Sequence, residues 1–327
     1  MSTDRRLPAP AVPLLAAILI LAATAAAQPL PPWRVLPIRS QEEARLGRTG
    51  GEAEQHPQGI ARSASDPDRL YLSHDVGQLW RSDDNGRTWR KTLGAGMFVK
   101  CGQSVEADPA DADTVLMIVD SAWDWFARDY EGVYRSTDAG ETWDLVLKTP
   151  AEHQRFHQHC LAYDPASTGP AGASRWYAGF PAGGLFASED GGRSWTKTAD
   201  LAAHQRVYGV YAHATDGRTV YLATSEGLLV STDRGADPRP LGDLPAGEVS
   251  GLAFHPTDPG RLYAAVLGVG LFVSADGGTH FEPLRLAADT QGVFAHGGNP
   301  KVIYFISRRT GSLVSTDAGR TWRPIHA

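Results

Sequence analysis

The stretch Ser82-Asp83-Asp84-Asn85-Gly86-Arg87-Thr88-Trp89 decides the fold, because it returns along the chain. Close copies and two weaker ones begin at five further serines: Ser136, Ser188, Ser231, Ser274 and Ser315. Successive starting serines lie 54, 52, 43, 43 and 41 residues apart. Periods of about 40–50 residues are typical of stacked supersecondary units, such as the four-stranded blades of a β-propeller.

Each repeat carries the same order of strand and turn signals. Around Ser274, an apolar run Gly251-Leu252-Ala253-Phe254 precedes the turn Asp258-Pro259-Gly260, and Leu262-Tyr263-Ala264 follows. A glycine then opens a third run, and the octapeptide leads into a fourth. Short apolar runs between Gly, Pro and Asp turns favour strands over helices. The sequence therefore predicts an all-β, six-bladed β-propeller over residues 58–327, with seven blades as the alternative.

The octapeptide itself has residues suited to holding a turn. A Ser hydroxyl and an Asp carboxylate can accept hydrogen bonds from turn N–H groups, Gly accepts a positive φ, and Trp can pack between strands. We therefore interpret the octapeptides as structural and expect neither a calcium loop nor a catalytic role for them.

The N-terminus has the pattern of a secretory signal. Arg5 and Arg6 precede a continuous apolar run over residues 11–27, which ends in Ala25-Ala26-Ala27. This pattern predicts a cleaved signal peptide over residues 1–27, with an uncleaved anchor as the alternative. We therefore expect a periplasmic or secreted protein with no membrane span after signal removal.

Residues 28–57 are expected to form an extension that includes one strand. Trp33-Arg34-Val35-Leu36 has the apolar alternation of a strand. Such a strand could clasp the first and last blades, because closing the ring removes exposed sheet edges.

Net charge limits the partner classes. The chain carries 31 Lys and Arg against 37 Asp and Glu, a formal charge of −6. A protein that follows nucleic-acid phosphates needs a basic face, so no nucleic-acid partner is expected. No motif in the sequence predicts a cofactor.

Polar residues gather at the predicted starts of the innermost strands. When the six strands are aligned on their first small residue, the position before it forms one ring: Gln58, Gln103, His159, Tyr208, Ser250 and Gln291. The position three before it forms another: His56, Cys101, His157, Arg206, Glu248 and Asp289. Residues two apart share a strand face, so both rings are expected to face the central channel. The alternative is that these residues bind no ligand and are polar only because water fills the channel mouth.

The predicted ligand-binding residues at this mouth are Gln103, His157, His159, Arg206 and Tyr208. His157 and His159 stand two apart, which is suitable spacing for a shared metal ion. A third strong ligand is missing apart from His56, so we predict hydrogen bonding to a ligand and no metal.

One loop contains aromatic residues between acidic ones. Residues 120–131 include Trp123 and Trp125. Exposed aromatic rings can stack on the C–H faces of sugars, so both are predicted ligand-binding residues. The alternative is that these rings fold back over the blade.

Cys101 and Cys160 lie on the first strands of adjacent predicted blades. Export to an oxidising compartment would permit a disulfide between them. Their different positions along the two strands favour separate thiols.

With these motifs in place, a family resemblance emerges. The octapeptide resembles the Asp-box (BNR) repeat of β-propellers in the sialidase and sortilin superfamily. Trp33-Arg34-Val35, Ser65-Asp66-Pro67-Asp68-Arg69-Leu70-Tyr71 and His74-Asp75-Val76-Gly77 resemble the N-terminal propeller of the glycoside hydrolase family 74 xyloglucanases. The resemblance implies a catalytic role for Asp75. The partner acid of those enzymes comes from a second propeller, and an inverting enzyme needs both carboxylates.

The motifs and the resemblance together point to two functions. The first is recognition of a glycan or polysaccharide, with glycosidase activity left open. The alternative is a non-catalytic periplasmic binding or assembly factor with a protein partner, similar to the photosystem II assembly propellers. Opposed carboxylates at the mouth would favour the enzyme, and an acid-poor mouth would favour the assembly factor.

Overall fold

The computed structural model describes residues 45, 57–75, 78–98, 101–120, 129–149, 159–180, 184–202, 204–287, 290–307, 309 and 311–325. From residue 57 onward they belong to one compact unit, Val35–Ala327. The predicted signal peptide and clasp strand lie outside the described residues.

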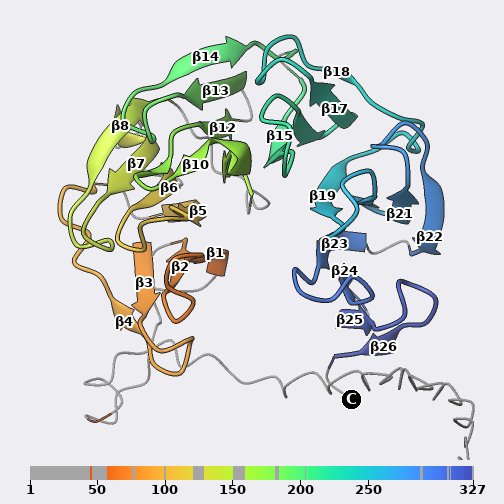
Figure 1. The fold of residues 1–327 in the computed structure, drawn as a ribbon, viewed down its shortest axis with the longest axis horizontal. Coiled ribbons are helices and arrows are strands. Elements are labelled where there is room, and N and C mark those ends of the chain that lie inside the picture. The colour runs from red at the N-terminus through yellow and green to blue at the C-terminus, as the bar shows by residue number, and fades with distance from the viewer. Residues whose placement is uncertain are drawn as a thin grey trace, which may run out of the picture. The chain divides into compact units, whose positions relative to one another are not determined.

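Six four-stranded antiparallel sheets follow one another along the chain and confirm the six-bladed propeller (Figure 1). Blades 1 to 3 contain β1 (Pro57–Arg62), β2 (Leu70–His74), β3 (Gln78–Ser82) and β4 (Arg90–Lys91); β5 (Cys101–Ala107), β6 (Val115–Asp120), β7 (Gly132–Ser136) and β8 (Asp144–Lys148); β9 (Leu161–Tyr163), β12 (Trp176–Phe180), β13 (Gly184–Ser188) and β14 (Thr196–Ala199).

Blades 4 to 6 repeat the pattern with β15 (Val207–Ala212), β16 (Val220–Thr224), β17 (Gly227–Ser231) and β18 (Arg239–Pro240); β19 (Val249–Phe254), β20 (Leu262–Val266), β21 (Gly270–Ser274) and β22 (Glu282–Leu286); β23 (Thr290–Ala295), β24 (Ile303–Ser307), β25 (Gly311–Ser315) and β26 (Arg323–Pro324). A small hairpin, β10 (Thr168–Gly169) and β11 (Gly172–Ala173), and a 3-10 turn, Pro165–Ser167, extend blade 3.

The first strand of each blade lies innermost. Figure 1 places β1, β5, β15, β19 and β23 nearest the centre of the ring. Because neighbouring strands are antiparallel, the starts of these strands share one rim with the links between blades. The octapeptide turns between third and fourth strands lie on the opposite rim. The inner-strand starts therefore surround one mouth of the channel.

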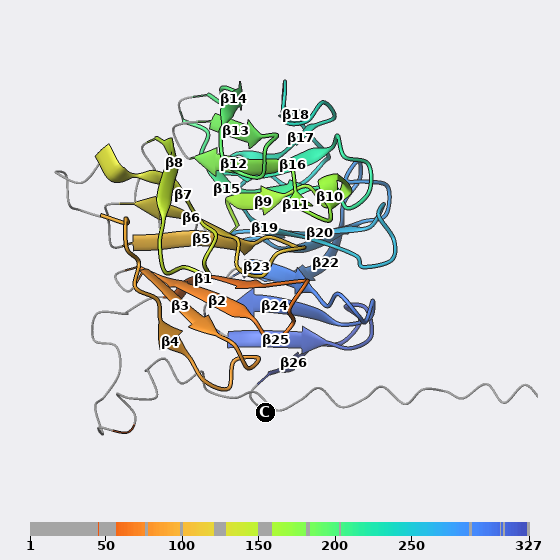
Figure 2. The same cartoon turned by 60° about the vertical axis from the view of Figure 1, so that its left-hand side comes forward.

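Apolar side chains between neighbouring sheets form the core. Blades 1 and 2 lie side by side in Figures 1 and 2, and Tyr71, Val105 and Met117 belong to one buried cluster between them. The same second-strand tyrosine position is buried in blades 3, 4 and 5, at Tyr177, Tyr221 and Tyr263. In blades 1, 3, 4 and 5 the recurring tyrosine therefore marks a position buried between neighbouring blades.

The octapeptide turns are held by their own side chains, as the sequence predicts. In the first turn, Ser82 Oγ accepts a hydrogen bond from Gly86 N at 2.8 Å, and Asp84 Oδ1 accepts one from Thr88 N at 2.8 Å. The Thr88 side-chain hydrogen bond is the main cause that lowers the pKa of Asp84 to about 2. In the second turn Gly140 has φ +88°, and an added Cβ would lie 2.7 Å from Leu79. That position requires glycine.

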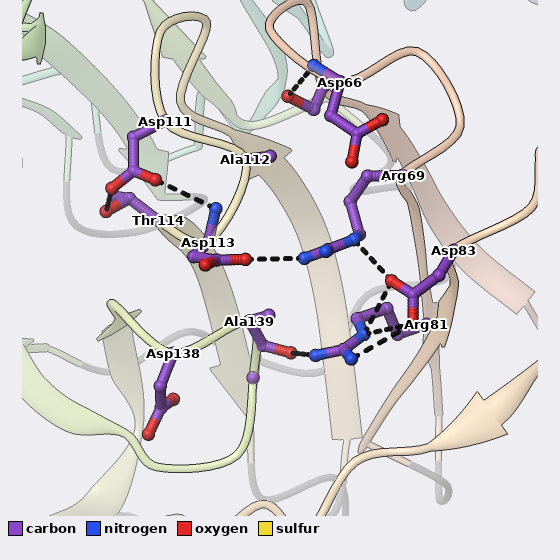
Figure 3. Close-up of polar contacts among 12 residues, drawn as sticks. Asp66, Arg69, Arg81, Asp83, Asp111, Ala112, Asp113, Thr114, Asp138 and Ala139 are labelled. Carbon is purple, nitrogen blue, oxygen red and sulfur yellow. Dashed lines mark hydrogen bonds and ion pairs between the residues drawn. The ribbon is translucent and has the colours of Figure 1, made fainter.

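Arginines just before the second strand and near the end of the third strand join neighbouring blades on the octapeptide rim. Arg69 contacts Asp83 of its own blade and Asp113 of blade 2, the latter at 2.7 Å (Figure 3). Arg81 also binds Asp83, and its guanidinium donates to Ala139 O of blade 2 at 3.3 Å (Figure 3). These contacts stabilise the packing of blade 2 on blade 1.

Most inner strands are interrupted at the polar ring predicted from the sequence. The register shifts around Gln58, Tyr208, Ser250 and Gln291, and around Gln103 in blade 2. A β-bulge places two residues opposite one and redirects the extra side chain. Simple two-residue alternation therefore does not describe these strand starts.

Candidate functional site

A polar cluster lies where blades 4 and 5 begin. The Tyr208 hydroxyl and the Glu248 carboxylate lie close enough to shift each other's pKa, and the Arg206 guanidinium lies close enough to interact electrostatically with both groups. Tyr208 and Glu248 are half-buried, whereas Arg206 is exposed. The cluster thus offers an aromatic ring, an acceptor and a cationic donor at the channel mouth.

Burial changes the acid–base properties of this cluster. Burial raises the pKa of Tyr208, and the nearby Glu248 charge adds to the rise. Burial also raises the pKa of Glu248, while the neighbouring Tyr208 hydroxyl and the Arg206 charge oppose that rise. Desolvation and neighbouring charges are the two effects expected at a partly enclosed binding site.

The backbone around Arg206 is fixed by hydrogen bonds to blade 4. Arg206 N donates to Ser225 Oγ at 3.0 Å, and Ser225 N donates to Arg206 O at 2.9 Å. Beside them, His204 Nε2 lies 3.1 Å from Glu226 Oε1. The sequence did not single out Ser225, because a serine in a hairpin carries no distinguishing signal. Glu248 was visible only as one member of a polar ring.

His159 lies next to the same inner strand. Its backbone bridges to Gly209, its carbonyl accepts a hydrogen bond from Val210 N at 2.8 Å, and its ring centroid lies 4.5 Å from that of Tyr211. Burial lowers the pKa of the imidazole to about 4. His159 is therefore neutral at pH 7. One of its ring nitrogens can donate a hydrogen bond, and the other can accept one.

Gln103 takes part in a separate, buried arrangement in blade 2. Its Nε2 donates to Asp120 Oδ2, and the Ser73 hydroxyl donates to its backbone carbonyl. Gln103 and Asp120 are 1% and 0% exposed, respectively. The Asp120 carboxylate therefore lies beneath the surface, bonded to an amide.

The remaining predicted site residues divide into two groups. Asp75 is half-buried at the end of β2. His157, Trp123 and Trp125 lie outside the described residues, and their roles stay predictions.

Cys160 is 1% exposed, its Sγ lies 3.7 Å from Val207 O, and burial raises the pKa of its thiol. The side chain of Cys101 is outside the described part, so the expectation of two separate thiols stays a prediction. Among the described residues, no group of three His, Cys, Asp or Glu side chains is arranged to hold a metal ion. No helix in that part of the chain is long and apolar enough to cross a membrane.

Comparison with known proteins was made at the levels of sequence and structure. No family model matches the chain, and no curated protein matches it. Among solved structures, the GH74 xyloglucanase from Xanthomonas campestris is similar with a TM-score of 0.64 and 21% identity, over 81% of this chain and 45% of that chain. The Niastella koreensis GH74 enzyme has a TM-score of 0.64 and 16% identity, over 84% and 47%. This chain therefore spans less than half the length of both enzymes.

YCF48 from Cyanidioschyzon merolae is similar over most of both chains, with a TM-score of 0.57 and 17% identity over 84% of this chain and 86% of that one. YCF48 bound to D1 peptide gives a TM-score of 0.59 at 16% identity, over 83% and 82%. Sequence identities this low show a shared fold and say nothing about a shared function. The chain is a six-bladed β-propeller whose structural neighbours include GH74 enzymes and the YCF48 propeller.

Proposed function

We propose that the chain is an exported β-propeller that recognises a glycan at the channel mouth through Arg206, Tyr208 and Glu248. The observation that carries the proposal is the joint placement of these three side chains at the starts of two adjacent inner strands. Saccharide hydroxyls can donate to the carboxylate and accept from the guanidinium, and the tyrosine ring can pack on C–H groups.

Binding is favoured over hydrolysis by the carboxylates of the described mouth. An inverting glycosidase needs an acid and a base that both reach the substrate. Asp120 is fully buried and bonded to Gln103, and Glu248 lies beside Tyr208 and Arg206. Of these two acids, Asp120 is therefore enclosed and cannot reach a substrate. Asp124 and Asp289, which could also assist Asp75, lie outside the described residues. The two GH74 neighbours are longer enzymes, and this chain covers less than half of the length of each.

A second candidate is a protein-binding assembly factor. The similarity to YCF48 covers more than four fifths of both chains, and one of these structures contains a bound peptide. Arg206 would then bind a peptide carboxylate, because a guanidinium forms a fork suited to carboxylate oxygens.

A calorimetric titration tests both candidates. The full chain is titrated with a xyloglucan oligosaccharide and, separately, with peptides that end in a free carboxylate. We expect binding to the oligosaccharide, and we expect Arg206→Ala to weaken it about 10- to 100-fold, because a charge-assisted hydrogen bond contributes about 1.5–3 kcal/mol. Arg239→Ala is the matched control, because Arg239 is exposed on the outermost strand of the same blade.

Each outcome of this titration is informative. Binding of peptides alone would replace the glycan function with the assembly function. Equal affinity of the Arg206→Ala and Arg239→Ala variants would remove the proposed site. Release of reducing ends from the polysaccharide, abolished by Asp75→Asn, would establish an enzyme in place of a binding protein.

A further inference from the structure

A surface hollow of about 390 Å³ lies between blades 3 and 4 on the octapeptide rim, opposite the channel mouth. Blade 3 lines it with its third strand, its octapeptide turn and its fourth strand, and blade 4 lines it with its octapeptide turn. A hollow of this size is within the range of small-ligand sites. Its lining includes Ala187, Glu189, Thr196, Asp233, Arg234 and Ala236.

The two preceding blade pairs show what fills the equivalent place. Between blades 1 and 2 it is the guanidinium of Arg81, which lies 3.1 Å from Asp83 and donates to Ala139 O at 3.3 Å (Figure 3). Between blades 2 and 3, Arg135 Nε donates to Gly191 O at 2.9 Å. In both pairs an arginine therefore joins the third strand of one blade to the octapeptide turn of the next.

Blade 3 has small side chains where blade 1 has arginines. Arg81 pairs with Arg90 across the third and fourth strands of blade 1, and Ala187 pairs with Thr196 at the same register in blade 3. The recurring second-strand tyrosine stands opposite both Arg81 and Ala187, which fixes the equivalence. The hollow is therefore the space that the two arginines would occupy.

The octapeptide turn of blade 4 keeps the backbone shape that receives an arginine, although its sequence has diverged. Arg234 has φ +55°, and Ala139 has φ +60° at the same place in blade 2. The N–H of each residue donates to the first-to-second strand turn of its own blade, at 2.8 Å in both. The Arg234 carbonyl is therefore placed like the Ala139 carbonyl that accepts from Arg81.

A carboxylate that holds two arginines in blade 1 holds only one of them in blade 3. Asp83 binds both Arg69 and Arg81 (Figure 3). Glu189 stands at the same place in blade 3 and binds Arg175, the counterpart of Arg69, at 2.8 Å. An alanine takes the place of Arg81. The side of Glu189 that faces the hollow is therefore suited to a second guanidinium.

A second carboxylate borders the hollow because the blade 4 turn has diverged. In blade 2, Asp138 Oδ1 accepts a hydrogen bond from its turn serine at 2.7 Å. In blade 4, Ser231 Oγ donates to Ala236 O instead. The Asp233 carboxylate lies 3.3 Å from Arg218, and both side chains are mostly exposed. Asp233 thus offers an acceptor to the hollow that is not needed to hold the turn.

We propose that this hollow binds an arginine side chain of a protein partner. The guanidinium donates to the Arg234 carbonyl, as Arg81 does to its own acceptor, and it binds the carboxylates of Glu189 and Asp233. Its planar fork of five N–H donors suits one carbonyl and two carboxylates better than a lysine ammonium does. The site lies on the rim opposite the proposed glycan site and does not depend on it.

Titration of the full chain with a blocked Gly-Arg-Gly peptide tests the proposal, followed through the NMR amide signals of residues 233–236. The matched peptide contains citrulline, which has nearly the shape of arginine without its charge. We expect the arginine peptide to bind at least about tenfold more tightly, because citrulline cannot form charge-assisted hydrogen bonds. A lysine peptide should also bind more weakly than the arginine peptide, because an ammonium lacks the fork.

Ala187→Arg is the decisive variant, because the chain then fills the hollow with its own guanidinium, as Arg81 does. It should weaken binding of the arginine peptide more than about tenfold. Ala275→Arg is the matched control, because it adds the same charge to an exposed residue of the same rim and leaves the hollow open. Asp233→Asn should weaken binding, whereas Arg234→Gly should strengthen it, because glycine accepts this φ and a like charge is removed.

Three results would overturn the proposal. Equal affinities for the arginine and citrulline peptides would show that the hollow does not recognise a guanidinium charge. Equal affinities of the Ala187→Arg and Ala275→Arg variants would place the peptide elsewhere. A lysine peptide that binds as tightly as the arginine peptide would show a site for any cation. Circular dichroism identifies a variant that fails to fold, and Thr196→Arg, which fills the hollow from the fourth strand as Arg90 does, then replaces Ala187→Arg with the same expected loss.

Discussion

Replacing Arg175 with alanine is expected to lower the free energy of unfolding by about 3 kcal/mol or more. The Arg175 guanidinium lies 2.8 Å from Asp164 and 2.8 Å from Glu189, and it donates to Gly217 O of blade 4 at 3.1 Å. The Arg175 and Asp164 side chains are 12% and 2% exposed. The substitution leaves Asp164 charged, buried and without its cation, and it removes a link between blades 3 and 4.

Chemical denaturation of the purified chain measures this effect. Arg239→Ala is the control, because its ion pair with Asp237 has side chains 72% and 70% exposed and should contribute less than about 1 kcal/mol. Equal unfolding free energies for the two variants would show that Arg175 does not join the blades. If Arg175→Ala does not fold, Arg175→Lys should show a smaller loss of the same sign.

The second large effect concerns a carboxyl group inside the sheet packing. Glu106 lies on β5 opposite Leu116, a residue of the core cluster that joins blades 2 and 3, and its charge influences Tyr163 of blade 3. Burial raises the pKa of Glu106 to about 8. The native state therefore favours the protonated acid, and the charged form destabilises the packing.

The sign of the pH dependence follows from this shift. The stability associated with a neutral Glu106 is fully present below the ordinary pKa of 4.5 and is lost as the pH rises through about 8. Glu106→Gln cannot ionise, so at pH 9 it should be more stable than the wild type by about 2–4 kcal/mol and near equal at pH 4. Thermal melts across this range measure the difference, with Glu282→Gln on the outer strand β22 as the control. Parallel curves for wild type and Glu106→Gln would contradict the account.

The blade architecture could be predicted because its signals are local and repeated. Tyr71, Tyr177 and Tyr263 recur at one place in the second strand, and all three are buried between blades. A turn made by Ser82, Asp84 and Gly86 needs only residues within one octapeptide. Such patterns survive in sequence because each copy satisfies the same short-range geometry.

The channel mouth was harder to predict because its geometry depends on strand pairing. The bulge at Tyr208 is set by the register between β15 and β16, and its mark in the sequence is only the glycine that follows it, Gly209. The proximity of Tyr208 to Glu248 involves two blades, so it became visible only in three dimensions. The links made by Arg69 and Arg175 were also missed, although an arginine two places before the strand tyrosine is a recurrent signal.

Hydrogen–deuterium exchange with and without a xyloglucan oligosaccharide tests the central claim, a glycan site at the channel mouth, most directly. The account predicts that the oligosaccharide slows exchange at residues 204–209 and 248–251, where Arg206, Tyr208 and Glu248 lie. It predicts unchanged exchange on the opposite rim, at residues 188–198 and 231–236, where a surface hollow is lined by Glu189, Asp190 and Asp233. Slowed exchange confined to that opposite rim, or no change at either place, would contradict a glycan site at the mouth.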